Sequence, residues 1–170
     1  MRLTTKSRYG LRILLDIAAH EGEGMVRAKD ITRRLGLTIK YVESLARLLA
    51  GTGYVRGCRG ANGGYCLGVE PEAVSIGRVI RHLEGGLDMA ECVARPEACL
   101  NAPVCPTRLV WVRAAQALAR ELDGLTLNDL LNLGSGVQGA CPFPEPPTAS
   151  RSVCPGGEGL TPSPACSFPL

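Results

Sequence analysis

Three cysteines and three prolines gather near the middle of the chain, and they limit what the surrounding stretch can become. They are Cys92, Cys99 and Cys105, with Pro96, Pro103 and Pro106 among them. Because proline lacks a backbone N–H and fixes φ, the stretch cannot run as a helix and is predicted to be a loop. A loop can fold its thiols onto a common centre, where three thiolates supply most of the ligands for an iron–sulfur cluster or a zinc ion.

The rest of the composition separates two interpretations of these cysteines. The chain has 170 residues and eight cysteines, which would suit the disulfide scaffold of a secreted protein. However, no export signal is visible at the N-terminus, and no apolar run approaches the ~20 residues that span a bilayer. We therefore expect a cytoplasmic protein without a membrane segment, in which the three loop cysteines serve metal binding or redox chemistry. The alternative is that they are ordinary loop thiols.

Charge is distributed unevenly along the chain. Residues 1–69 hold twelve Lys and Arg against five Asp and Glu, whereas the remainder holds seven against eleven. A basic first part and a mildly acidic second part predict a polyanionic partner for the first part.

Hydrophobic periodicity predicts three helices in the basic part, over residues 4–20, 28–35 and 39–49. A short turn at Gly36 separates the second from the third, which is the plan of a helix-turn-helix motif. The later helix of that motif enters the major groove of DNA. Thr38 is expected to cap this recognition helix. The residues predicted to face outward from it are Lys40, Tyr41, Glu43, Ser44 and Arg47.

Two features of this motif leave alternatives open. A carboxylate near phosphates weakens DNA binding, so Glu43 favours discrimination of cytosine through N4, unless it is a surface residue paired with Arg47. Arg2 and Lys6 belong to a basic cluster at the start of the first helix, where positive charge opposes the macrodipole. Phosphate contact would explain that cluster, and an ordinary solvated face is the alternative.

Two short β runs follow, at about 54–58 and 64–67, and they flank a glycine-rich turn. Asn62-Gly63 is a strong signal for a tight hairpin turn. A hairpin after a helix-turn-helix is a wing. Arg59 lies at its predicted tip, where an arginine can enter an adjacent minor groove.

A fourth helix is predicted over 75–84, before the cysteine loop, and the longest one runs from Thr107 to about Leu122. The long helix is apolar around most of its girth, so we expect it to pack against the same helix of a second subunit. A two-fold homodimer suits a pseudo-palindromic site on double-stranded DNA. The final 37 residues hold eight of the twelve prolines and show no period, which predicts disorder.

These patterns predict a mostly α fold with a small β-hairpin wing, that is, a winged helix-turn-helix with a long dimerisation helix. The expected divisions are a DNA-binding domain over 1–84, a cysteine loop over 85–106, the dimerisation helix and a short terminal helix over 107–133, and a tail over 134–170. The chain holds two histidines, His20 and His82, and shows no catalytic triad or carboxylate pair. An enzyme is therefore not expected.

Several of these stretches resemble the IscR-type iron–sulfur transcription regulators, which include the nitric-oxide-sensing NsrR branch. The stretches are MRLTTKSRY at the start, GLTIKYVE at the recognition helix, RGANGGY in the wing, and the three-cysteine loop, over residues 1 to about 133. The resemblance implies a winged-helix homodimer whose cluster state sets its DNA affinity, with Cys92, Cys99 and Cys105 as cluster ligands. It also implies DNA contacts from Lys40, Tyr41, Glu43, Ser44 and Arg59.

The fourth cluster ligand does not carry over from the family. The IscR branch has a histidine three residues after the last cysteine, where this chain has Arg108. The NsrR branch uses a carboxylate near the start of helix one of the other subunit, where this chain has Arg8. Either another group closes the site, with Glu91, Asp88, Thr107 and His82 as candidates, or one iron keeps a labile external ligand. The cluster type, 2Fe–2S or 4Fe–4S, is therefore open.

The expected function is a dimeric DNA-binding transcriptional regulator, controlled by an iron–sulfur cluster that senses iron–sulfur status, redox state or nitric oxide. One alternative keeps the DNA-binding fold but uses a zinc or thiol–disulfide switch. Another is a small electron-transfer iron–sulfur protein, which would leave the basic first part and the wing unexplained.

Overall fold

The computed structural model describes residues 3–60 and 63–136, and helices dominate this part of the chain. The helices are α1 (Thr5–His20), α2 (Ala28–Leu35), α3 (Ile39–Ala50), α4 (Ile76–Glu84), α5 (Glu91–Ala94), α6 (Pro106–Asp123) and α7 (Leu127–Gly136), with one-turn 3-10 helices η1 (Glu21–Glu23), η2 (Pro71–Ala73) and η3 (Pro96–Ala98). The strands β1 (Val55–Cys58) and β2 (Gly64–Leu67) form an antiparallel hairpin in which Val55 pairs with Leu67 and Cys58 with Gly64. The predicted fold class, mostly α with a β-hairpin wing, is confirmed.

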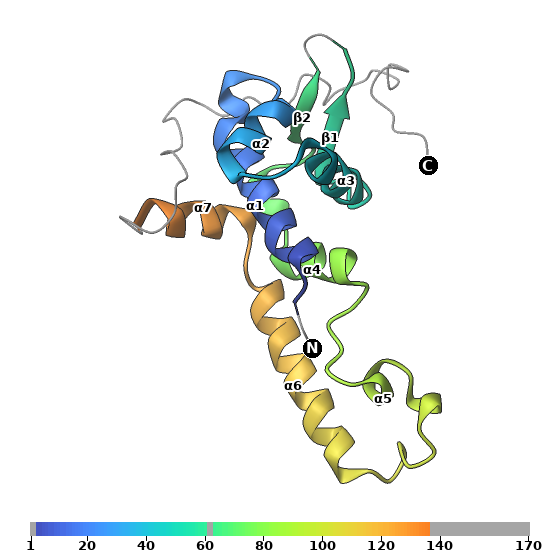
Figure 1. Cartoon of the computed structure of the whole chain (residues 1–170). Helices are drawn as coiled ribbons and strands as arrows, with labels where there is room; N and C mark the ends of the chain where they lie inside the picture. The colour runs from blue at the N-terminus through green and yellow to red at the C-terminus, as the bar shows by residue number, and fades with distance from the viewer. Residues whose placement is uncertain (1–2, 61–62, 137–170) are drawn as a thin grey trace, which may run out of the picture.

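Helices α1–α4, the hairpin and α7 form one packed unit, which we call the head (Figure 1). Its core draws side chains from each of these helices and from both strands. Leu14, Ile31, Leu45, Val79 and Leu127 are among those that are fully buried. Burial of apolar side chains from segments far apart in the sequence is the main favourable term in folding, so the head holds the stability of the chain.

Local chemistry sets the helix boundaries in the head. The Thr4 side chain accepts a hydrogen bond from the Lys6 N–H at 3.1 Å and so caps α1. Gly36 ends α2 with φ of 65°, a left-handed conformation that glycine adopts without a Cβ penalty. Thr38 occupies the N-cap position of α3, but its side chain makes no capping hydrogen bond.

A buried ion pair ties α1 to α2. The Asp16 side chain is fully buried, and Arg34 donates from Nε and Nη2 to its two carboxylate oxygens, both at 2.7 Å. His20 lies next to the pair, with Nδ1 2.7 Å from the Asp16 backbone oxygen. Because a buried charge is tolerated only when it is paired, this contact fixes the first helix of the helix-turn-helix against α1.

Residues 88–123 form what we call the arm, and Leu87 just before them is buried in the core of the head. Helix α6 runs away from the head, and the cysteine loop with α5 lies beside the far part of α6 (Figure 1). No residue of α5, η3 or α6 is buried. The arm therefore presents most of its side chains to the surroundings of this single chain.

Two sequence predictions about these segments need correction. The cysteine loop is not free of helix, because α5 and η3 each add a single turn between the prolines; one turn fits where a longer helix is blocked. Helix α7 ends at Gly136, three residues beyond the predicted end at Leu133 and inside the segment predicted to be disordered. Residues 137–170 lie outside the described residues. Within the described ranges, no helix is both long and apolar enough to cross a bilayer.

Candidate DNA interface and cysteine loop

Helix α3 presents a polar face to solvent. Val42, Leu45, Ala46 and Leu49 are buried in the core of the head, which fixes the rotation of the helix about its axis. The opposite face is exposed and carries Lys40, Glu43, Ser44 and Arg47. These residue types can pair with base edges or phosphates in a major groove, so the exposed face has the chemistry of a recognition helix.

The hairpin lies beside α3 and extends this polar face. A shallow cavity of about 360 Å³ separates the two, and it is lined by Ala28, Glu43, Arg47, Gly57, Cys58, Arg59, Gly60, Gly63, Gly64 and Tyr65. Burial raises the pKa of the Tyr65 hydroxyl, and the negative charge of Glu43 raises it further, while Arg47 acts in the opposite direction. Glu43 and Arg47 are therefore directed toward the wing as well as outward.

Arg59 is exposed at the end of the hairpin, next to a close approach of backbone. A hydrogen bond from the Gly63 N–H to the Gly60 oxygen at 3.0 Å closes the turn, whose residues 61–62 are not described. A Cβ at Gly63 would lie 2.4 Å from the Cys58 oxygen, so only glycine fits there. The structure therefore places Arg59 at the tip, where the sequence predicted it.

The start of α1 adds basic side chains, and one aromatic ring organises two of them. Lys6, Arg8 and Arg12 are exposed, while Arg2 lies outside the described residues. The guanidinium groups of Arg8 and Arg12 lie 5.7 and 5.5 Å from the centre of the Tyr9 ring, at cation–π distance. The sequence prediction missed Tyr9, although arginines one residue before and three residues after it were a local signal.

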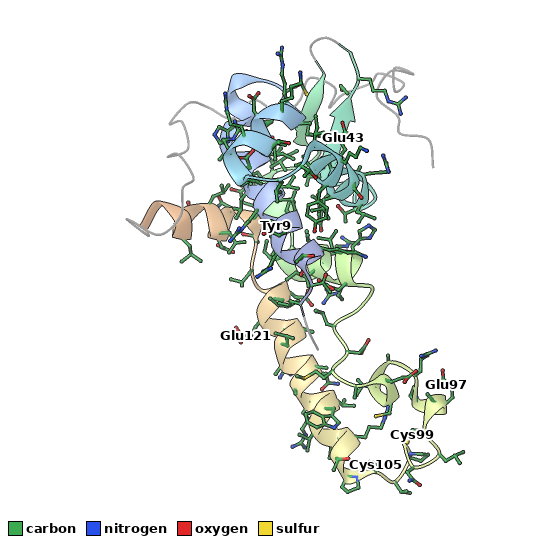
Figure 2. All side chains as sticks on the ribbon, in the orientation of Figure 1. Tyr9, Glu43, Glu97, Cys99, Cys105 and Glu121 are labelled. Carbon is green, nitrogen blue, oxygen red and sulfur yellow. The ribbon has the colours of Figure 1, made fainter. Side chains whose placement is uncertain are left out.

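Tyr41 lies differently from its predicted neighbours on α3. It is half-buried, its hydroxyl is buried without a hydrogen-bond partner, and its ring meets Tyr9 edge-on at 5.9 Å between centres. Figure 2 shows Tyr9 on α1, the helix that this contact joins to α3. Tyr41 thus packs between α1 and α3 rather than pointing outward, and its contact with DNA stays a prediction.

The three loop cysteines lie in different local structures within the arm. Cys92 is in α5, Cys99 follows η3, and Cys105 occupies the N-cap position of α6. Each is half-buried, and each is a free thiol. Figure 2 shows Cys99 and Cys105 in the same loop close to the start of α6.

The three cysteine thiols are suitable ligands for a metal centre, but their positions in the single chain do not bring them together around one. Thiols are the ligands that iron–sulfur clusters and zinc sites use. Among the described residues, however, no group of three or more His, Cys, Asp or Glu side chains lies close enough to hold a metal ion. The single chain in this conformation does not assemble a three-cysteine centre, so the ligand set stays a prediction.

Arg108 joins the two ends of the loop, and Thr107 contacts the cysteine at the second end. Arg108 Nε donates to the Cys92 backbone oxygen at 2.9 Å, which joins α5 to α6. The Cys105 sulfur lies 3.1 Å from the Thr107 hydroxyl, and this hydrogen bond lowers the pKa of the Cys105 thiol below its usual value. The backbone and charge of Arg108 act in the same direction. A lower pKa raises the thiolate fraction, and the thiolate is the form that binds metals and attacks disulfides.

Comparison with known proteins gives consistent results over most of the chain. A family model, Rrf2, described as iron-dependent transcriptional regulator, matches residues 3–133. The protein rrf2 of Nitratidesulfovibrio vulgaris is 44% identical over 131 residues, which cover 77% of this chain and 87% of that protein. The HTH-type transcriptional regulator CymR of Bacillus subtilis is 38% identical over 143 residues, which cover 84% of this chain and 99% of CymR.

Solved structures agree with these relatives. The structure of T. potens IscR matches with a TM-score of 0.66 at 35% identity, over 82% of this chain and 93% of that one. The resemblance to IscR-type regulators inferred from the sequence motifs is confirmed, and the matched proteins are regulators, not enzymes. The chain therefore belongs to the Rrf2 family and is a DNA-binding transcriptional regulator.

Proposed function

We propose that this protein acts as a cytoplasmic homodimer whose affinity for a pseudo-palindromic operator is controlled through Cys92, Cys99 and Cys105. The observation that carries the proposal is the place of these cysteines. All three lie on the segment that joins the DNA-reading head to the exposed helix α6. Any change that ties or releases that segment therefore acts between the head and the dimer helix.

The proposed DNA contacts follow from the exposed polar face of the head. Lys40, Glu43, Ser44 and Arg47 would read the major groove from α3, with Thr38 at its start, while Arg59 would reach the adjacent minor groove from the wing. Lys6, and Arg2 before it, would contact phosphates at the start of α1. In this assignment only the α3 and wing residues carry sequence information, and the α1 residues carry affinity.

Homodimerisation is proposed through α6. Leu109, Val110 and Trp111 are exposed on it, although side chains of this type are expected to be covered. A second copy of the same helix is the simplest cover, because a two-fold pair of α6 helices would place two heads on two half-sites. We expect Trp111→Asp to shift the protein to monomer in sedimentation equilibrium and the exposed-site change Gln116→Glu to leave it a dimer.

An iron–sulfur cluster is the proposed form of control. The three thiolates would hold it, and a bound cluster would supply chemistry that responds to iron, redox state or nitric oxide. Neither Arg8 nor Arg108 is a fourth ligand of ordinary type, so either another donor of the chain completes the site or one iron keeps a labile external ligand. Tying the loop would change the relative pose of the two heads, and a coupling of about 1–3 kcal/mol would change affinity roughly 5–150-fold.

A second candidate is a zinc site or a thiol–disulfide switch at the same cysteines. Two observations favour the disulfide version: the described residues do not gather a three-ligand centre, which zinc would also need, and the pKa of Cys105 is lowered, as in reactive thiols. In this version a disulfide or a zinc ion would join the cysteines of the loop, and the relative pose of the two heads would change in the same way.

Anaerobic purification followed by quantitation of iron, sulfide and zinc tests the form of control. The cluster predicts stoichiometric iron and sulfide with visible absorption that disappears in Cys99→Ala and persists in Cys58→Ala. Zinc without sulfide supports the metal version of the second candidate. A metal-free protein whose DNA affinity changes on diamide oxidation, except in Cys99→Ala, supports the disulfide version.

Measuring DNA affinity in the different states of the cysteines tests whether the cysteines regulate DNA binding. The probe is a duplex selected by the wild-type protein from a randomised pool, and affinity is measured for the reduced metal-free protein and for the protein in its modified state. Equal affinity in both states would reject control by the cysteines. Lys6→Ala should weaken binding to all duplexes alike, with a salt slope smaller by about 1, whereas Glu43→Ala should change base preference.

A further inference from the structure

The N-terminus of α1 is capped by a residue from a distant part of the head. The backbone N–H and the hydroxyl of Thr4 both donate to Glu84 Oε1, at 2.9 and 3.0 Å, across 80 positions of sequence. In a capping box, a carboxylate at the third helical position accepts from the N-cap N–H. Here that position is Ser7, and the first turn of α1 contains no acidic residue. Glu84 supplies the missing carboxylate from α4.

This carboxylate suits its place electrostatically. A negative charge at a helix N-terminus complements the macrodipole, which the basic first turns of α1 oppose. Burial would raise the pKa of Glu84, but hydrogen bonds from Ser7 and Thr4 outweigh it and hold that pKa below its usual value. The Glu84 contact therefore fixes the turn that carries Lys6, one of the proposed phosphate contacts.

Glu84 is also the last helical residue before the arm. Gly85 and Gly86 follow with φ of 78° and 154°, and Gly85 closes α4 through a hydrogen bond to the Arg81 oxygen at 2.9 Å. Both φ values are ones that side-chain-bearing residues rarely adopt. Leu87 follows these glycines and is buried in the core of the head, and the first cysteine of the loop, Cys92, comes five residues later. A displacement of the loop therefore reaches Glu84 through Leu87 and the two glycines.

The same helix contacts the arm a second time, at the end of α6. Arg81 donates to both carboxylate oxygens of Asp123, at 3.1 and 2.5 Å. A Cβ at Gly77 would lie 2.2 Å from Asp123 Oδ1, so the backbone of α4 comes very close to the end of α6. Helix α4 is thus held by α6 and by the loop, while Glu84 holds α1.

We propose that Glu84 is the positioning residue that couples the cysteine loop to DNA binding, by capping α1 in the high-affinity state of the loop and withdrawing in the low-affinity state. This inference rests on the proposed control through the cysteines. Without Glu84, two donors at the start of α1 lose their acceptor, and the first turn loses its fixed position. The basic side chains on that turn then contact phosphates less well.

If Glu84 only stabilised the head, its removal would have a different effect. Its removal would weaken DNA binding by the same factor in both states of the cysteines, because the head is common to both. Removal of a coupling residue lowers the ratio of the two affinities toward 1. That ratio is therefore the deciding measurement, and it is independent of general loss of stability.

The experiment measures this affinity ratio for wild type, Glu84→Ala, Glu84→Gln and Thr4→Val, on the same selected duplex. Glu72→Ala, on the exposed side chain of η2, is the matched control. We expect Glu84→Ala to lower the ratio roughly threefold or more, within the usual range of coupling energies. Glu84→Gln keeps an acceptor without the charge and should lie between, and Glu72→Ala should match wild type.

Hydrogen exchange of the first amides of α1 gives a second readout. We expect these amides to exchange faster in the low-affinity state of wild type, and equally fast in both states of Glu84→Ala. A ratio in Glu84→Ala equal to that of wild type overturns the inference; if that variant does not fold, the ratio in Thr4→Val decides in the same way. A wild-type ratio of 1 is a separate result, because it rejects the control through the cysteines whatever Glu84 does.

Discussion

In the head, helices and a hairpin close around one core, whereas in the arm no residue of α5 or α6 is buried. Leu14 in the head is fully buried, and Leu100 at the arm is 99% exposed. The charged groups differ in the same way, because Asp16 and Arg34 are paired inside the head while Arg95 and Glu91 pair on the surface of the arm.

The difference teaches where each region obtains its stability. The head buries its own apolar surface and needs no partner for its core. The arm leaves apolar side chains and three thiols accessible, so its order depends on what covers or binds it. In a regulator of this construction, reaction of the thiols or association through the exposed apolar side chains can change the arm without unfolding the DNA-reading head.

The largest predicted effect breaks the ion pair inside the head. Arg34→Met removes the arginine partner of the fully buried Asp16, beside whose carboxylate His20 Nδ1 lies at 3.8 Å. The change should lower the free energy of unfolding by about 3–5 kcal/mol, measured by urea denaturation. Arg33→Met is the matched control one residue earlier, because the Arg33 side chain is 77% exposed and pairs with Asp30 on the surface. That change should cost less than about 1 kcal/mol. Similar losses in both variants would contradict the special role of the buried pair.

A core substitution compares the two regions directly. Leu14→Ala removes a fully buried side chain from α1 and should destabilise the head by about 3 kcal/mol. Leu109→Ala on α6, where the side chain is 56% exposed, should change the unfolding of a dilute monomer by less than about 0.5 kcal/mol. The same change should weaken the dimer. If Leu109→Ala destabilised the isolated chain as much as Leu14→Ala, the distinction between head and arm would be wrong.

A smaller effect is expected at the junction where the chain returns from the arm to the head. Asp129 N–H donates to the Thr126 hydroxyl at 3.2 Å, a side-chain cap at the start of α7. Thr126→Ala should lower the free energy of unfolding of the head by about 1 kcal/mol, measured by denaturant titration, because Leu127 and Leu131 anchor α7 in the core. Thr126→Ser keeps the hydroxyl and serves as the control. An equal loss in both variants would show that the methyl group, not the cap, matters.

The smallest effect is a dependence on pH confined to the head. Hydrogen bonds from Thr126 lower the pKa of Asp129, and those from Ser7 and Thr4 outweigh burial to lower the pKa of Glu84. A carboxyl whose pKa is lower in the folded state adds stability above its unfolded pKa, about 4, and that stability is lost as pH falls through the folded value. Unfolding free energy measured below about pH 4.5 should therefore fall less steeply in Asp129→Asn with Glu84→Gln than in wild type.

The local elements were predictable because their signals are local. Apolar residues at helical spacing, Gly36 between two helices and the prolines of the cysteine loop all act on the backbone within a few residues. The same holds for Arg59, whose place at the wing tip follows from the turn beside it. The single turns of η1, η2, α5 and η3 were not predicted, because one turn of helix leaves no period to detect, and neither were the last residues of α7.

Contacts between distant residues were decided by the tertiary structure. The sequence names Tyr41 as an outward residue of α3, but the rotation that buries Val42 and Leu45 turns Tyr41 toward Tyr9. The pairing of Thr4 with Glu84 leaves no local trace either, since it depends on how α1 and α4 cross.

The sequence by itself determined which elements form, the basic face of the first part and the set of thiols on one loop. Those properties depend on residue type and short spacing. The tertiary structure decided that Asp16 meets Arg34, that Glu84 caps α1, and that the three sulfurs of a single chain do not converge. Such pairings depend on the angles and distances at which whole elements pack, and no pattern along the chain encodes these directly.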